Sequence, residues 1–191
     1  MYNIMITVID NALADPLFKS IIDIVDHRDF PWYLGNDIDD TNKFKKGTQT
    51  KQLIHLLFSN IKDWGNDKEM NIASPHTDFI HKLIMPILEQ NKVYGDIVKS
   101  KFNLLFPHHK NLNHNVVHID LEEPHYSITY YLNNSDGDTI FFKDDNTELQ
   151  RVEPKENRMV ISNGIYHASS NPIKSSFRKV LNIVVRKQKV F

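Results

Sequence analysis

Apolar residues in the first half of the chain recur at two spacings, and each spacing predicts a different element. In Pro16–His27 and Thr77–Gln90 they lie three and four residues apart, which is typical of amphipathic helices. Pro86 lies inside the second run and predicts a kink or a new turn, because proline removes a helical N–H. Short apolar or alternating runs predict strands at Ile4–Ile9, Phe30–Leu34, Leu53–Phe58 and Lys101–Phe106.

Two polar stretches interrupt these elements. Gly35–Lys51 is rich in lysine and aspartate and poor in apolar residues, and Asn60–Ser74 also reads as a loop. A solvated loop is one interpretation of Gly35–Lys51. A mobile lid or substrate-contacting loop is the other, since long polar loops in compact domains often have such roles.

From Val116 onward the pattern is that of an all-β unit. Tyr126–Leu132 alternates aromatic residues with Ser and Thr, and the Asn-, Asp- and Gly-rich segment Asn133–Asp138 predicts a tight turn. Further strands are predicted at Thr139–Phe142, Glu148–Val152, Arg158–Ile161, Tyr166–Ser169 and Phe177–Arg186. Many short strands with regular breaks favour a barrel or a double-sheet jelly roll.

Composition narrows the class of protein. The chain has 191 residues, which suffices for one well-buried domain, and 40% of them are hydrophobic. A formal net charge of −1 provides no broad field for a nucleic-acid backbone or an acidic membrane. The lack of cysteine excludes disulfides, zinc-thiolate sites and thiol nucleophiles, and favours a reducing compartment. Neither a signal peptide in Met1–Asp10 nor a membrane-spanning run is expected.

Three His-x-Asp pairs are present, and their contexts separate them. They are His27-Arg28-Asp29, His76-Thr77-Asp78 and His118-Ile119-Asp120. On a strand, residues i and i+2 share a face and can bind one ion, whereas on a helix they diverge by about 200°. His27 ends a helical run and His76 begins one. Only His118 has β-branched neighbours, so its pair is the best metal candidate.

His167 and Arg178 complete a candidate site. Two imidazoles and one carboxylate form the facial triad of non-haem Fe(II) oxygenases, which leaves three metal positions for other ligands. A guanidinium stays charged and can bind a carboxylate bidentately. In the predicted final strand, Arg178 shares a face with Asn182, and Lys179 is the competing cation on the opposite face.

With these residues the chain resembles the Fe(II)/2-oxoglutarate-dependent dioxygenases, especially their prolyl-4-hydroxylase-like branch. The resemblance runs from about Lys101 to Val185, and the matching elements are His118-x-Asp120, Tyr130-Tyr131-Leu132-Asn133, Gly137-x-Thr139, His167 and Arg178-x-x-Leu181. The sequence around Tyr131 and Gly137 is similar to that of small, stand-alone members of the family, including some from viral genomes.

The resemblance implies a single oxygenase domain, mainly β with flanking helices. It implies a double-stranded β-helix (jelly roll) core over residues 98–186, with the mixed N-terminal part, 1–97, providing helices packed on one sheet. Fe(II) would be held by His118, Asp120 and His167. Arg178 would pair with the far carboxylate of 2-oxoglutarate, and the Tyr131 hydroxyl would share it. O2 would be consumed and succinate and CO2 released, with ascorbate as an additional candidate cofactor.

The chain departs from the family at two positions. Asp138 stands where a second glycine is common, and Phe106 stands where a tyrosine often precedes the proline, so one contact to the co-substrate is missing or made differently.

The other histidines are interpreted first as structural residues and not as metal ligands. His55 is expected in the core and His125 at the surface or a strand edge, where it could face the mouth of the site. A polar loop is expected to hold His108, His109 and His114.

Three functions remain open. The first is an active 2-oxoglutarate-dependent hydroxylase or demethylase, the second a cupin-like metal enzyme without a 2-oxoacid, and the third a catalytically silent β-barrel binding module. The substrate is unknown; a peptide, a protein or a small molecule is favoured over nucleic acid, and prolyl hydroxylation rests on family analogy alone. We expect a cytoplasmic protein (in the host cytoplasm if virus-encoded) without a membrane partner, and the oligomeric state is left open.

Overall fold

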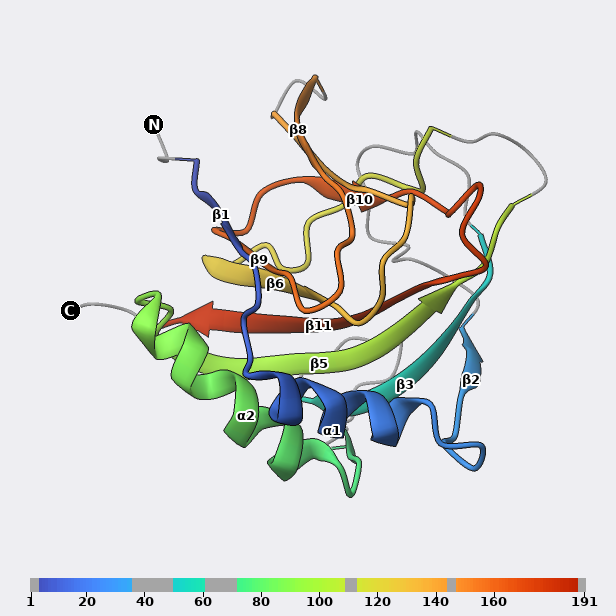
Figure 1. Ribbon diagram of the computed structural model, residues 1–191. Helices are drawn as coiled ribbons and strands as arrows, with labels where there is room; N and C mark the ends of the chain where they lie inside the picture. Colours follow the sequence, from blue (N-terminus) through green and yellow to red (C-terminus); the bar gives the residue numbers. More distant parts are fainter. Residues whose placement is uncertain (1–3, 36–49, 61–71, 109–112, 144–146, 189–191) are drawn as a thin grey trace.

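Residues 4–35, 50–60, 72–108, 113–143 and 147–188 are described by the computed structural model of this chain. Most of the predicted lid, Gly35–Lys51, lies outside these ranges, as does His109. Over the described residues, two antiparallel sheets face one another, and two helices cover the outer face of the larger sheet (Figure 1).

The larger sheet has eight strands in the order β1-β9-β6-β11-β5-β3-β2, with β4 paired to β3. The smaller sheet has the order β10-β7-β8. The strands are β1 (Ile6–Ile9), β2 (Tyr33–Gly35), β3 (Gln52–Ser59), β4 (Ile72–Ala73), β5 (Gly95–Leu105), β6 (His125–Tyr131), β7 (Thr139–Phe142), β8 (Glu148–Val152), β9 (Met159–Ser162), β10 (His167–Ser169) and β11 (Arg178–Lys187). The predicted fold, mainly β with a jelly-roll core and helices on one sheet, is confirmed.

The helices form because their apolar residues make one stripe each. Helix α1 (Asp15–Val25) buries Phe18, Ile21 and Val25, which are three and four residues apart, and has a proline in its first turn. Helix α2 (Thr77–Gln90) has the predicted bounds and continues through Pro86. Both stripes pack on the larger sheet, where they meet side chains such as Phe102, Ile128, Tyr130, Leu181 and Ile183. None of the described helices is long and apolar enough to cross a membrane.

Three local predictions need correction. Strand β4 occurs inside the stretch expected to be a loop, and β5 begins at Gly95, six residues before its predicted start at Lys101. The early part of β5 carries charged residues on one face, which hid its strand character. His118 lies in no regular strand; it forms an isolated bridge with His167. Its orientation therefore depends on a pairing between residues far apart in sequence.

Candidate active site

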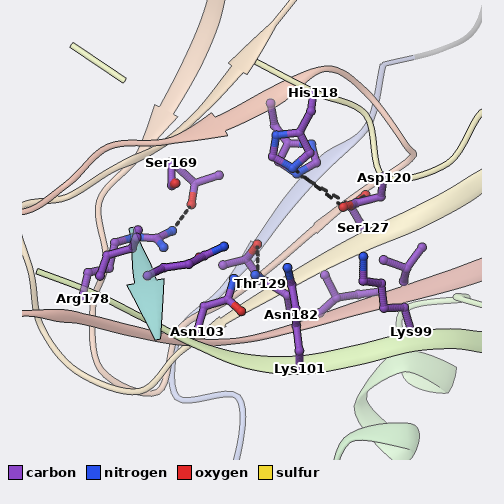
Figure 2. Close-up of a pocket in the computed structure, with 16 residues that line it drawn as sticks. Lys99, Lys101, Asn103, His118, Asp120, Ser127, Thr129, Ser169, Arg178 and Asn182 are labelled. Carbon is purple, nitrogen blue, oxygen red and sulfur yellow. Dashed lines mark hydrogen bonds and ion pairs between the residues drawn. The ribbon is translucent and has the colours of Figure 1, made fainter. Parts of the chain in front are cut away.

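The backbone bridge between His118 and His167 brings the two imidazoles together. Each residue donates its N–H to the carbonyl of the other, at 2.9 Å and 2.8 Å, and the two ring centroids lie 4.5 Å apart. The Asp120 carboxylate completes the group: Oδ1 lies 3.9 Å from His118 Nε2, and Oδ2 lies 3.7 Å from His167 Nε2. All three residues line one pocket, and Figure 2 shows His118 and Asp120 on the same side of it.

Hydrogen bonds behind the cluster orient each side chain. Nδ1 of His118 lies 3.1 Å from the Val116 carbonyl, and Nδ1 of His167 lies 2.9 Å from the Ile165 carbonyl. A carbonyl only accepts hydrogen bonds, so each Nδ1 carries a proton, and Nε2 is the ring nitrogen that lies near the Asp120 carboxylate. Ser127 donates its hydroxyl proton to Asp120 Oδ2 at 2.5 Å. Such second-layer contacts are what metal-binding histidines and carboxylates require.

Electrostatics favour the protonation states that bind a metal. Burial, together with the neighbouring His167, lowers the pKa of His118 to about 4, so its imidazole is neutral at pH 7. Burial by itself raises the pKa of Asp120. The His167 and His118 side chains and the Ser127 hydroxyl outweigh this and hold that pKa below its usual value. Neutral imidazoles and an ionised carboxylate are the forms that coordinate metals.

The donor set fits a divalent transition metal. All three ligand atoms lie within 4.8 Å of one another. Two ligands at about 2.1 Å from an ion lie at most about 4.2 Å apart, and both His–Asp distances are shorter than that. Two imidazoles and one carboxylate with open positions suit non-haem Fe(II). The His118 and His167 side chains expose 15% and 13% of their surface, so they are reachable from the pocket.

Arg178 lies at the other end of the same pocket. It is 3% exposed, its Nε donates to the Gly137 carbonyl at 2.7 Å, and one terminal nitrogen donates to Thr139 Oγ1 at 2.8 Å. Burial lowers the pKa of Arg178, but a guanidinium remains charged at neutral pH. Both hydrogen-bond acceptors are neutral oxygens. A buried guanidinium is costly without an anion, so this end of the pocket suits a carboxylate.

The contacts of Gly137 and Thr139 show why the Gly-x-Thr motif has these two residues. A Cβ at position 137 would lie 2.7 Å from the Ser170 carbonyl oxygen, which is too close for any side chain, and 3.1 Å from Arg178 Cδ, so the backbone packing requires glycine here. Thr139 Oγ1 accepts hydrogen bonds from both Arg178 and the Tyr131 hydroxyl, the latter at 2.7 Å. Since it already accepts two, its own proton is available for an acceptor in the pocket. Asp138, at the non-glycine position, lies 3.7 Å from Arg151.

Tyr131 lies behind this layer. Its side chain is fully buried in an apolar cluster between the sheets, and its ring lies 5.5 Å from the Arg178 guanidinium carbon. Its hydroxyl bonds to Thr139 Oγ1, and Thr139 lines the pocket. Direct contact between Tyr131 and a co-substrate stays a prediction, and the route through Thr139 was not apparent from the sequence.

The two cations of the final strand have opposite environments. Arg178, Asn182 and Val184 face the pocket. Lys179 faces the helices, is 4% exposed and pairs with Asp26 just after α1. The register of β11 therefore directs the Arg178 side chain into the pocket and the Lys179 side chain toward the helices.

Sequence reasoning missed a polar strip on the pocket floor. Lys99, Lys101 and Asn103 project from alternate positions of β5 into the pocket (Figure 2). The Asn103 amide oxygen is buried and has no hydrogen-bond partner among the described residues. Thr129 donates to Asn182 at 3.3 Å beside them. The alternation of buried and less buried positions along residues 95–105 is typical of a strand. Lys99 and Lys101 made this segment resemble an exposed loop in the sequence.

The other candidate histidines have structural surroundings. His55 is a satisfied core residue as predicted, with Nδ1 2.9 Å from the Pro31 carbonyl and Nε2 2.9 Å from Ser74 Oγ. His125, expected at the surface or a strand edge, begins β6 but is only 1% exposed, because its ring packs against Gly164. His114 is partly buried against Phe142. Of the other His-x-Asp pairs, His27 is exposed and His76 precedes the first turn of α2.

Solved structures with the same arrangement identify the fold. An oxidoreductase of the 2OG-Fe(II) oxygenase family from Burkholderia pseudomallei is similar over 97% of this chain and 87% of its own, with a TM-score of 0.70 and 9% identity. A prolyl-4-hydroxylase from Pseudomonas putida gives a TM-score of 0.58 and 17% identity over 95% of this chain and 92% of its own. This chain has the fold of the 2OG-Fe(II) oxygenases.

A third structure with the oxygenase fold contains a bound peptide. It is a prolyl hydroxylase from Trichoplax adhaerens in complex with a hypoxia-inducible-factor degradation-domain fragment, with a TM-score of 0.62 and 12% identity. The similarity covers 95% of this chain and 83% of that one. No family model matches the sequence, and no curated protein matches it. The similarity to the oxygenases is therefore detected by comparison of structures and not by comparison of sequences.

Proposed function

We propose that this chain is an Fe(II)- and 2-oxoglutarate-dependent dioxygenase that oxidises a substrate C–H bond and releases succinate and CO2. One observation carries the proposal: a His-Asp-His cluster and a buried arginine occupy opposite ends of one pocket. The oxygenase fold shared with the solved structures supports it.

The residues divide the binding of metal and co-substrate between them. His118, Asp120 and His167 hold the iron through two neutral nitrogens and one carboxylate oxygen, and Ser127 steadies the carboxylate. Bound iron supplies the oxygen activation, with O2 as the second co-substrate and ascorbate as a candidate reductant. The protein residues orient these molecules and shield the reaction from water.

At the far end, Arg178 binds the second carboxylate of 2-oxoglutarate. The Gly137 carbonyl holds the guanidinium by a hydrogen bond, and Thr139 can donate its proton to the same carboxylate. Tyr131 fixes Thr139 through its hydroxyl, which is how we account for its proposed part in co-substrate binding. A five-carbon diacid carries a carboxylate for each end of the site, whereas pyruvate lacks the second carboxylate.

Metal and co-substrate titrations test the proposal directly. Purified protein treated with a chelator should bind one Mn(II), and Mn(II)-loaded protein should then bind 2-oxoglutarate more tightly than pyruvate, as measured by calorimetry. With Fe(II) and O2 it should release succinate, and chelation should stop this release. Metal binding without any preference for 2-oxoglutarate would favour a cupin-like enzyme. Failure to bind metal would favour a silent binding module.

The substrate is the finer part of the proposal. Peptidyl hydroxylation, on proline or another residue, is supported by the peptide bound to the structurally similar hydroxylase. A screen that measures succinate release against peptide, amino-acid and nucleoside pools would decide it. Stimulation by nucleosides and not by peptides would reject a peptide substrate.

A further inference from the structure

Two lysines project into the pocket from the floor strand, on the side of the metal cluster. Lys99 and Lys101 are partly buried, and Figure 2 shows both side chains rising from β5 toward Asp120 and His118. Their register places them near the cluster. Lys99 pairs with Val184 on β11, and Val184 pairs with Ser127, the residue that hydrogen-bonds Asp120.

The same register separates them from Arg178. Arg178 pairs with Leu105, which is four residues beyond Lys101 and six beyond Lys99. A strand advances about 3.4 Å per residue, so the lysine backbones lie roughly 14 Å and 20 Å along β5 from that end. The lysines therefore form a basic group distinct from the arginine.

Charge balance shows what this basic group adds. Fe(II) brings two positive charges, Asp120 removes one, and Arg178 adds one, which equals the two negative charges of 2-oxoglutarate. Among the described residues that line the pocket, Asp120 is the single carboxylate. The metal, Asp120, Arg178 and the co-substrate are thus neutral together before the lysines are counted. The two ammonium groups are further positive charges on the pocket floor, beside the metal end.

We propose that Lys99 and Lys101 form a subsite for an anionic group, a carboxylate or a phosphate, carried by the primary substrate. This subsite rests on the proposed function, since it defines the substrate of that same centre. Lys99 and Lys101 are alternate residues of one strand, so their side chains lie on one face and can bind the same anion. Such an anion would hold the oxidised C–H bond close to the metal.

Small anions probe the subsite without knowledge of the natural substrate. Mn(II)-loaded protein saturated with 2-oxoglutarate, kept free of O2, is titrated by calorimetry with acetate, acetamide and inorganic phosphate. We expect acetate or phosphate to bind at least tenfold more tightly than acetamide, which has the shape of acetate without its charge. The tighter of the two anions identifies the carboxylate or the phosphate as the substrate group.

Matched variants locate the binding. Lys99→Met and Lys101→Met each keep the length of the side chain and remove its charge, and each should weaken anion binding at least tenfold. Affinity for 2-oxoglutarate should change less than threefold. Lys82→Met, on the exposed face of α2, is the control and should leave both affinities unchanged.

Three results would overturn the subsite. Anion binding that survives both lysine changes would place it elsewhere, and equal loss in Lys82→Met would show a general charge effect. A tenfold loss of 2-oxoglutarate affinity in Lys101→Met would assign that lysine to the co-substrate. Failure of wild-type protein to bind Mn(II) would instead reject the proposed function. Titrating the metal-free protein with the same anions separates these cases, because lysine-dependent binding there supports the subsite by itself.

Discussion

The two faces of β11 belong to different parts of the molecule although they alternate along one strand. On one face, Leu181 and Ile183 are buried against the helices. On the other, Arg178 and Asn182 line the pocket. The same alternation continues in β5, where Phe102 packs under the helices and Lys101 faces the pocket.

This difference separates stability from chemistry within one sheet. Each fully buried aliphatic side chain on the helix face contributes roughly 1.5–3 kcal/mol through loss of water contact. The pocket face carries charged and polar groups, whose burial costs free energy unless interactions with partners offset it. Substitutions on the two faces should therefore change different measured quantities.

His167→Ala tests the pocket side most severely. Removal of one of three ligands should lower metal affinity by roughly 10²-fold or more and abolish succinate release, because even the loss of a supporting contact costs 10–100-fold. The free energy of unfolding of the metal-free protein should stay nearly unchanged. Calorimetric Mn(II) titration and denaturant unfolding measure the two quantities. His27→Ala is the control, and an equal loss of metal binding there would refute the site assignment.

Leu181→Ala tests the helix side. Its side chain is fully buried, so truncation should reduce the free energy of unfolding by about 2–5 kcal/mol. Metal and 2-oxoglutarate affinities of the folded protein should change little, since the pocket lies on the opposite face. Leu17→Ala, at an exposed position of α1, should cost far less. A pure loss of co-substrate affinity without destabilisation would contradict the division between the faces.

Arg178→Met and Lys179→Met compare the two faces at adjacent residues. The first should raise the apparent KM for 2-oxoglutarate by at least tenfold, since a hydrogen bond to a charged group is worth roughly 1.5–3 kcal/mol. The second should lower stability by breaking the contact with Asp26 and leave that KM unchanged. Steady-state kinetics and thermal unfolding separate them. The reverse result would mean that the opposite face of β11 binds the co-substrate.

Tyr131→Phe should have the smallest effect. It removes only the hydroxyl that fixes Thr139, and a neutral hydrogen bond is worth about 0.5–1.5 kcal/mol, or roughly a 2- to 10-fold rise in KM for 2-oxoglutarate. Thr139→Val should have at least as large an effect, because it removes the group that faces the pocket. A larger loss in Tyr131→Phe than in Thr139→Val would indicate direct contact between Tyr131 and the co-substrate.

Local pattern determined much of the scaffold. The bounds of α2, β7 and β8 agree with the sequence pattern, because turn-forming residues flank the two strands and apolar residues recur at helical spacing along α2. The division of the chain near residue 97 into support and core stays a prediction. Only the second half of strand β5 was predicted. Its first half contains charged residues, and such residues suggest a loop when they are assumed to be exposed to solvent.

The candidate ligands were also named from sequence, through the spacing of His118 and Asp120 and the downstream His167, and the resemblance assigned all three to Fe(II). Only the tertiary structure, however, brings these three side chains close together in space. His118 is oriented by a two-residue bridge to a partner 49 positions away, and such a bridge leaves no periodic signal. The position of Thr139 between Tyr131 and Arg178 and the proposed lysine subsite on β5 likewise arise only when the two sheets face each other. Sequence alone determines which residue types are present and which face of a strand they share. Packing of the sheets determines which of those faces encloses a pocket.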